Sequence, residues 1–148
     1  MFRGVTTVSL DSKGRLIVPT RYRDALVARA EGRVVVTADP IGCLLLYPEP
    51  EWEPIETKLM GLSTFNSRIR HMQQVLVGYA EVLDLDANGR ILLTTSLRQF
   101  AELDKSVVLV GQGMKFELWN DARWAARVEG AVSFKDAEMP SELEGFTL

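Results

Sequence analysis

Hydrophobic and polar positions follow the same order twice along this chain. Residues 5–18 and 80–93 each begin with a run rich in apolar and β-branched residues, pass through a short polar stretch and continue as a second apolar run. Such runs, bounded by turn-forming residues, are typical of β-strands. The pattern therefore predicts two strand–turn–strand units, one in each half of the chain.

Both polar stretches carry the same five-residue pattern, Asp-x-x-Gly-Arg, at residues 11–15 and 86–90. A glycine permits the left-handed backbone that a tight connection needs, and an aspartate side chain can accept hydrogen bonds from amides of its own turn. Each arginine then leaves the turn at a fixed place. The residues expected to shape the two turns are Asp11, Gly14, Asp86 and Gly89.

The remaining elements also recur in order. After the first unit we expect a helix over 21–28 capped by Thr20, strands at 34–37 and 43–47, a helix from about 51 to 62, and a helix capped by Asn66 or Ser67. After the second unit we expect a capped helix that begins near Thr95 or Ser96, strands at 107–110 and 115–119, and a helix containing Trp124.

The spacing between the halves indicates a tandem duplication. Asp86 follows Asp11 by 75 positions, and Trp119 follows Tyr47 by 72. We therefore expect two halves, residues 1–75 and 76–131, followed by an acidic tail over 132–148 that is irregular or a frayed helix. Neither half can satisfy its strand edges alone, so the two should close on one another as one compact unit with pseudo-twofold symmetry. The expected class is α+β, mainly β with short helices.

Composition is that of an ordinary single domain. The chain has 148 residues, of which 47% are hydrophobic and 25% charged. No apolar run approaches the roughly 20 residues that span a bilayer. The opening residues lack the apolar core of a signal peptide, so we expect a cytoplasmic protein without membrane contact.

The charge is unevenly distributed. The net charge is −3 and the pI about 5.2, which disfavours nucleic acid when taken globally. Residues 1–40, however, hold seven basic and four acidic residues, whereas residues 100–148 hold five basic and nine acidic ones. An ordinary solvated surface remains open as the explanation, but the first half is the better candidate for binding an anion.

Enzymatic functions find little support. His71 is the only histidine, and Cys43 is the only cysteine and lies in an apolar strand, where we expect it to be buried. Gly111-Gln112-Gly113 lacks the third glycine and following helix of a nucleotide-binding loop. Asp84 and Asp86 alone provide only weak support for a catalytic acid–base pair. We expect no catalytic residue, no metal, no cofactor and no small-molecule substrate.

Several segments together resemble the MraZ family of bacterial transcriptional regulators. They are the opening Met1-Phe2-Arg3-Gly4, the turn with its sequel Pro19-Thr20-Arg21-Tyr22-Arg23, the stretch 44–48 with Glu51-Trp52, and the second turn. The resemblance implies a pseudo-twofold swapped-hairpin (double-psi-like) β-barrel related to AbrB-like regulators. It also implies a ring-shaped homo-oligomer of roughly eight or more subunits.

The function implied by the resemblance is sequence-specific binding of double-stranded DNA. The expected targets are short direct repeats in the promoter region of the protein's own operon, in the division and cell-wall gene cluster, with repression as the expected effect and the nucleoid as the location. A ring would make weak contacts jointly strong. The alternative is a ring-forming protein scaffold, which salt dependence would distinguish, because phosphate binding weakens as salt rises.

Arginine bonds bidentately to guanine or phosphate, and a β-turn can enter a major groove. For Arg15 and Arg90, a salt bridge that only shapes the turn remains an alternative. Lys13 and Arg21 are expected to touch phosphates. The first half is the main candidate because the second has Thr94 in place of Pro19 and a less basic helix. The residues expected to contact DNA are Arg3, Lys13, Arg15, Arg21, Arg23 and Arg90.

Overall fold

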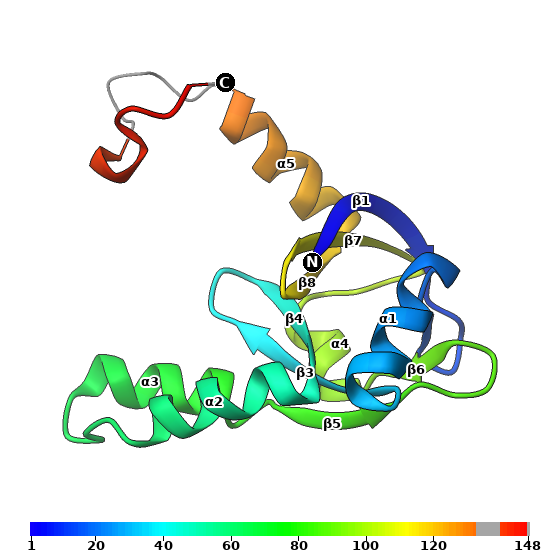
Figure 1. Ribbon diagram of the computed structural model, residues 1–148, viewed down its shortest axis with the longest axis horizontal. Coiled ribbons are helices and arrows are strands. Elements are labelled where there is room, and N and C mark those ends of the chain that lie inside the picture. The colour runs from blue at the N-terminus through cyan, green and yellow to red at the C-terminus, as the bar shows by residue number, and fades with distance from the viewer. Residues whose placement is uncertain (133–139, 148) are drawn as a thin grey trace.

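The computed structural model describes residues 1–132 and 140–147, and its strands form two separate sheets (Figure 1). The elements are β1 (Phe2–Ser9), β2 (Arg15–Ile17), α1 (Thr20–Ala30), β3 (Arg33–Asp39), β4 (Cys43–Pro48), α2 (Glu49–Met60), α3 (Ser67–Leu76), β5 (Glu81–Asp84), β6 (Arg90–Leu92), α4 (Thr95–Phe100), β7 (Ser106–Gly113), β8 (Lys115–Asn120), α5 (Asp121–Val132) and the short 3-10 helix η2 (Ser141–Leu143). Strand, strand, helix, strand, strand, helix thus occurs twice, as the sequence predicts, with α3 as an addition to the first half.

The two halves exchange strands. In the larger, six-stranded sheet the order is β1-β7-β8-β4-β3-β5, so the first strand of each half pairs with the third strand of the other. The smaller sheet is a two-stranded ribbon of β2 and β6, again one strand from each half. Neither half keeps its own first strand, and the sheets therefore exist only when both halves are present.

The larger sheet is open. Its edges are β1 and β5, each of which pairs with one strand of this sheet, and after each of them the chain turns into the separate ribbon. The expected mixture of strands and helices from two repeats is confirmed. The expected closed swapped-hairpin barrel is not confirmed, because the hydrogen bonds between strands leave the sheet open.

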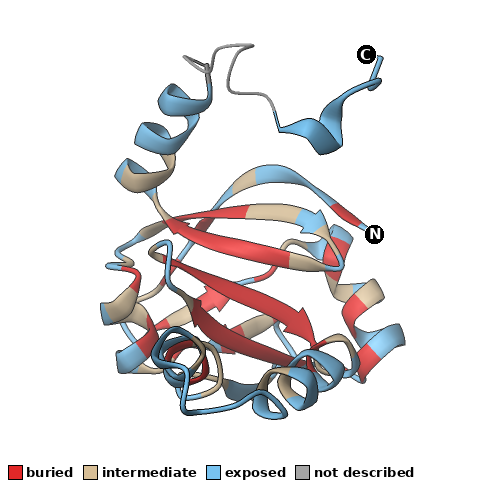
Figure 2. Cartoon of the chain, turned by 90° about the vertical axis from the view of Figure 1, so that its left-hand side faces the viewer, coloured by how far each residue is buried: buried red, intermediate tan, exposed pale blue. Residues whose placement is uncertain are grey.

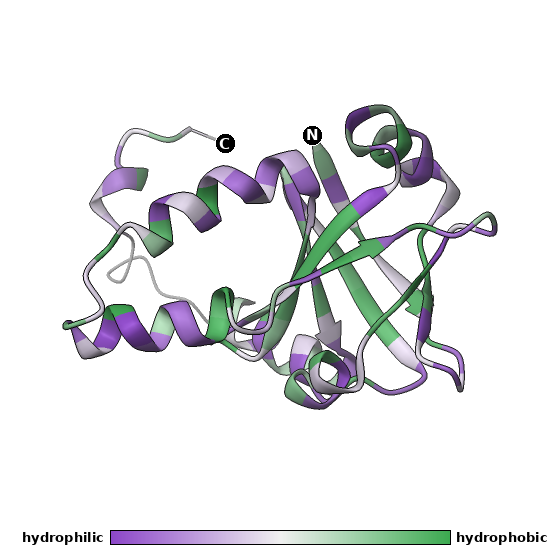
Figure 3. Ribbon diagram, turned by 90° about the horizontal axis from the view of Figure 1, so that it is seen from below, coloured by the Kyte–Doolittle hydropathy of each residue, from purple (hydrophilic) through white to green (hydrophobic). Residues whose placement is uncertain are grey.

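Both faces of the larger sheet are covered, as the unbroken burial along β4 requires (Figure 2). One face packs with the ribbon, α1 and α4 in a core that includes Leu16, Ile91 and Phe116. The other face packs with α2 and α5 in a second core that includes Cys43, Trp52 and Trp119. The expected burial of Cys43 is confirmed. Figure 3 shows the hydrophobic strands surrounded by helices and loops of mixed or hydrophilic character.

Helix starts differ in detail from those expected. Asn66 caps α3 as predicted, by accepting hydrogen bonds from the N–H groups of Arg68 and Ile69. Thr20, however, is the first residue of α1 and not its cap, whereas α4 begins at Thr95, as expected, with Thr94 as its cap. α2 begins at Glu49, before the expected start near residue 51, so Pro50 occupies its first turn and Pro54 lies inside the helix.

The helical hairpin α2–α3 extends away from the sheet, opposite to α1 and the two turns (Figure 1). Gln73 is buried and holds the hairpin closed: its side-chain amide donates to the carbonyl oxygens of Leu59 at 3.0 Å and Leu62 at 3.2 Å. The expectation of an irregular tail falls partly on residues 133–139 and 148, which lie outside the described residues. Residues 140–147 are exposed and contain η2.

Candidate nucleic-acid interface

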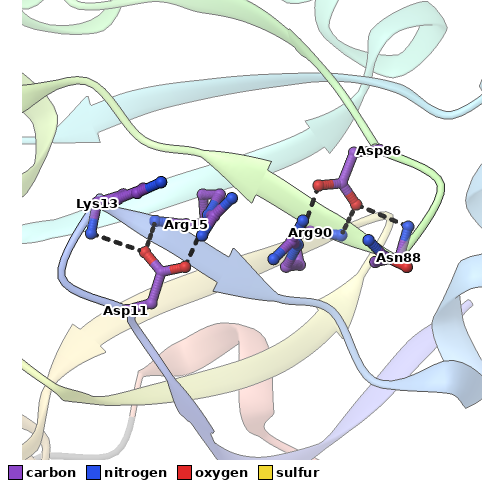
Figure 4. A network of polar contacts seen from close by, with 6 residues as sticks. All are labelled: Asp11, Lys13, Arg15, Asp86, Asn88 and Arg90. Atoms are coloured by element: carbon purple, nitrogen blue, oxygen red, sulfur yellow. Dashed lines mark hydrogen bonds and ion pairs between the residues drawn. The ribbon is translucent and has the colours of Figure 1, made fainter.

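The first turn is closed by one carboxylate. Asp11 Oδ1 accepts hydrogen bonds from the backbone N–H groups of Lys13 and Arg15, both at 2.9 Å, and Oδ2 accepts from Arg15 Nε at 2.7 Å (Figure 4). Gly14 takes the left-handed conformation, with φ of +87°, that a side chain would disfavour. One aspartate therefore fixes both the path of the backbone and the direction of the arginine.

The second turn repeats this arrangement. Asp86 Oδ1 accepts from the N–H groups of Asn88 at 2.8 Å and Arg90 at 2.9 Å, and Oδ2 accepts from Arg90 Nε at 3.0 Å (Figure 4). Gly89 has φ of +74°. The two turns are thus near copies in their hydrogen bonds as well as in sequence.

These contacts change the acidity of both aspartates. The hydrogen bond from the Arg15 N–H, together with the Arg15 side chain and the Lys13 N–H, lowers the pKa of Asp11 from 3.8 to about 2. The pKa of Asp86 is lowered for the same reasons, with the Arg90 N–H as the largest cause. Both carboxylates are therefore charged at neutral pH and keep their arginines in place.

We expect the first turn to lose its hold on Arg15 only in strong acid. Because the pKa of Asp11 is lower in the folded chain, its contribution to stability is fully present above about pH 3.8 and is lost as the pH falls through about 2. NMR titration of the carboxyl carbon should give this low midpoint. Asp11→Asn, which cannot ionise, should remove the corresponding part of the pH dependence of unfolding. A midpoint near 4 for Asp11 would contradict the geometry.

The β2–β6 ribbon brings the two arginines onto one surface. Its register pairs Arg15 with Leu92 and Ile17 with Arg90, around a central pair that is fully buried. Since alternate residues of a strand point to opposite faces, the flanking residues lie on the outer face. The side chains of Arg15 and Arg90 are 31% and 26% exposed.

Each arginine keeps part of its guanidinium for a ligand. The ion pairs with the aspartates use Nε, and no side chain within residues 1–132 or 140–147 pairs with the Nη atoms of Arg15 or Arg90. The sequence left open whether these arginines shape the turn or bind a ligand. The geometry allows both, because the atom that holds the turn differs from those that point outward.

Arg23 is partly exposed and lies against the turn of the other half. Its Nε donates to the carbonyl oxygen of Val18 at 2.7 Å, and its side chain lies against the second turn, where a Cβ on Gly89 would come within 2.0 Å of that Nε. An arginine of the first half therefore covers the turn of the second.

Arg98 does the same in reverse, and sequence reasoning missed it. Its Nε donates to the carbonyl oxygen of Leu93 at 3.3 Å, and a Cβ on Gly14 would lie 2.8 Å from that Nε. The signal was available, because the offset of 75 that relates the turns also relates Arg23 to Arg98.

The other predicted basic residues form a looser set. Lys13 is exposed at the tip of the first turn. Arg3 and Arg21 are exposed on β1 and α1, where the Arg21 guanidinium donates to the Thr6 hydroxyl and lies over the Tyr22 ring.

A thiol and two carboxylates lie close together near the end of β3. Side-chain atoms of Asp39, Cys43 and Glu117 lie within 4.8 Å of one another. Burial, aided by the charges of Glu117 and Asp39, raises the pKa of the Cys43 thiol to about 12. Glu117 accepts a hydrogen bond from Trp119 Nε1 at 3.0 Å. A protonated thiol is a poor nucleophile, so Cys43 gives no support for nucleophilic catalysis.

Comparison with known proteins also finds two repeats, each of which contains one of the two turns. The family described as "MraZ protein, putative antitoxin-like" matches residues 1–75 and again residues 76–141. Three relatives carry the name "Transcriptional regulator MraZ": those of Thiobacillus denitrificans (68% identical), Nitrosomonas eutropha (55%) and Pseudomonas aeruginosa (46%), each covered over 100% of both chains. No described helix is long and apolar enough to cross a bilayer. With two family matches and full-length relatives, the chain belongs to the MraZ family.

Proposed function

We propose that this protein is a sequence-specific DNA-binding transcriptional regulator that presents the outer face of the β2–β6 ribbon to the major groove. The observation that carries the proposal is the pair of aspartate-held arginines, Arg15 and Arg90, on one face of a two-stranded ribbon. A two-stranded ribbon fits the major groove, where arginine bonds bidentately to guanine O6 and N7. The names of the relatives support the same function.

The other basic residues have supporting roles in this proposal. Lys13 at the turn tip, Arg3 on β1 and Arg21 on α1 contact phosphates and set the position of the protein on the duplex. Arg23 and Arg98 act on DNA indirectly, by holding the turns from which Arg15 and Arg90 project. The four residues that shape the turns are Asp11, Gly14, Asp86 and Gly89.

The wider biological setting is also proposed. The targets are short direct repeats in the promoter region of the protein's own operon, which belongs to the division and cell-wall gene cluster. Binding there represses transcription. The protein is cytoplasmic and associated with the nucleoid. A ring of identical subunits would offer one ribbon to each successive repeat and so convert weak contacts into strong binding. The exchange of strands between the halves supports kinship with swapped-hairpin regulators.

The proposal is tested with a labelled duplex from the region upstream of the protein's own gene. Fluorescence anisotropy should show tight binding to this duplex, much weaker binding to a scrambled one, and an affinity that falls steeply as salt rises, because the protein displaces counterions from phosphates. Light scattering on the same samples gives the number of subunits. Equal, weak binding to both duplexes at low salt, by an intact ring, would instead favour the protein scaffold.

A further inference from the structure

The outer face of the β2–β6 ribbon is not wholly polar. Ile17 is 43% exposed and Leu92 is 56% exposed, although each belongs to a strand of only three residues whose middle residue is completely buried. Ile17 lies directly across from Arg90, and Leu92 directly across from Arg15. Each outward-facing arginine therefore has an exposed aliphatic side chain as its cross-strand neighbour.

The repeat gives this pairing its significance. Single exposed aliphatic residues are common on protein surfaces and need no explanation. Here, however, Ile17 and Leu92 are separated by 75 positions, as are Arg15 and Arg90. Both halves thus place an arginine at the start of the short strand and an aliphatic residue two positions later, and the ribbon sets the two pairs side by side.

This combination matches two chemical features of the major groove. Guanine presents acceptors at O6 and N7 that arginine can bond, and thymine presents a 5-methyl group that is the groove's apolar feature. Phosphate binding alone would call for no aliphatic residue between the arginines. We propose that Ile17 and Leu92 determine specificity by contacting thymine methyl groups beside the guanines bonded by Arg15 and Arg90, an inference that rests on the DNA-binding function proposed above.

Charge argues against a second copy of the chain as the occupant of this face. Two ribbons packed against each other would bring two pairs of arginines together, and like charges in contact are costly. The Nη atoms of Arg15 and Arg90 have no partner in the described part of the chain, and a polyanion supplies the opposite charge. DNA therefore fits both the charged and the aliphatic parts of the face.

The test replaces thymine by uracil, which removes only the methyl group. In the duplex that the wild-type protein prefers over a scrambled one, each thymine is changed singly. We expect the wild type to bind about fourfold more weakly for each methyl group it contacts. Ile17→Ala and Leu92→Ala should weaken binding to the thymine duplex by a similar factor and should no longer respond to uracil at their own position. Ile41→Ala, in an exposed aliphatic residue 48% accessible at the β3–β4 turn, is the matched control and should behave as wild type.

The possible outcomes distinguish failure of the thymine-methyl contacts from failure of the proposed DNA-binding function. If the wild type distinguishes the specific from the scrambled duplex but ignores every uracil, the methyl contacts are refuted and the regulator stands. If Ile17→Ala and Leu92→Ala change the assembly size in light scattering and leave the uracil response intact, the face is a contact between copies and the inference is overturned. If the wild type does not distinguish the duplexes, both proposals fall. Thermal unfolding confirms that each variant is folded.

Discussion

Phe116→Ala is expected to lower the free energy of unfolding by about 3–5 kcal/mol. Phe116 is 1% exposed, and its ring centroid lies 4.3 Å from that of Phe2 and 4.7 Å from that of Tyr22. Because Phe116 belongs to β8 in the second half, whereas its two partners belong to β1 and α1 in the first, this cluster joins the repeats. Removing the ring leaves a cavity at their junction, and chemical denaturation measures the cost.

The chain offers a matched control for this experiment. Phe65, in the loop between α2 and α3, is 100% exposed, and Phe65→Ala should change the stability by no more than about 0.5 kcal/mol. The two variants lose the same atoms, so the difference between them reports burial alone. Unfolding of both at the same denaturant concentration would contradict the position of Phe116 at the junction.

Arg15→Ala and Arg90→Ala are each expected to reduce discrimination between the specific and scrambled duplexes by about 1–3 kcal/mol, the contribution of a bidentate contact with guanine. Each arginine projects from a turn fixed by its own aspartate, so losing it removes a preset contact rather than a flexible one. Anisotropy at a fixed salt concentration measures both affinities. A larger loss from Arg15 than from Arg90 would identify the first half as the main reading surface, as the charge distribution predicts.

Two further variants exclude simpler explanations. Arg70→Ala removes the same charge from an exposed position on α3, far from the turns, and should bind both duplexes nearly as wild type does. Arg15→Lys keeps the charge but loses the planar fork, so it should retain non-specific binding and lose discrimination. Full discrimination by Arg15→Lys would make Arg15 a phosphate contact. Normal DNA binding by Arg15→Ala would exclude a DNA contact by Arg15 and would leave this residue only its role in shaping the turn.

Local features of this fold could be predicted because their causes lie within a few residues. The Asp-x-x-Gly-Arg spacing predicts a turn closed by its own aspartate, and the hydrogen bonds of Asp11 and Asp86 have that form. The cap at Asn66 and the burial of Cys43 follow in the same way from neighbouring residues. The duplication was visible in spacing alone, and the repeated order of elements confirms it.

What could not be predicted depends on residues far apart in the sequence. Alternation shows that β1 is a strand but does not say that its partner is β7. Arg23 is basic and close to a turn, which suggests a ligand contact, but it covers the turn of the other half because strand exchange brings Gly89 beside it. Arg98 lies in a helix with few basic residues, so charge alone does not single it out, whereas its equivalence to Arg23 across the repeat does.

Strand exchange has a consequence for the protein while it is being made. Ser9 at the end of β1 pairs with Ser106 in β7, and Arg98 covers the turn that contains Gly14. A nascent chain on the ribosome therefore exposes the first turn long before the residues that aim its arginine have been synthesised. A product truncated before β6 would contain Arg15 but neither β6 nor Arg98 to support its turn. The ribbon that sets Arg15 and Arg90 side by side can therefore form only in a chain that contains both halves.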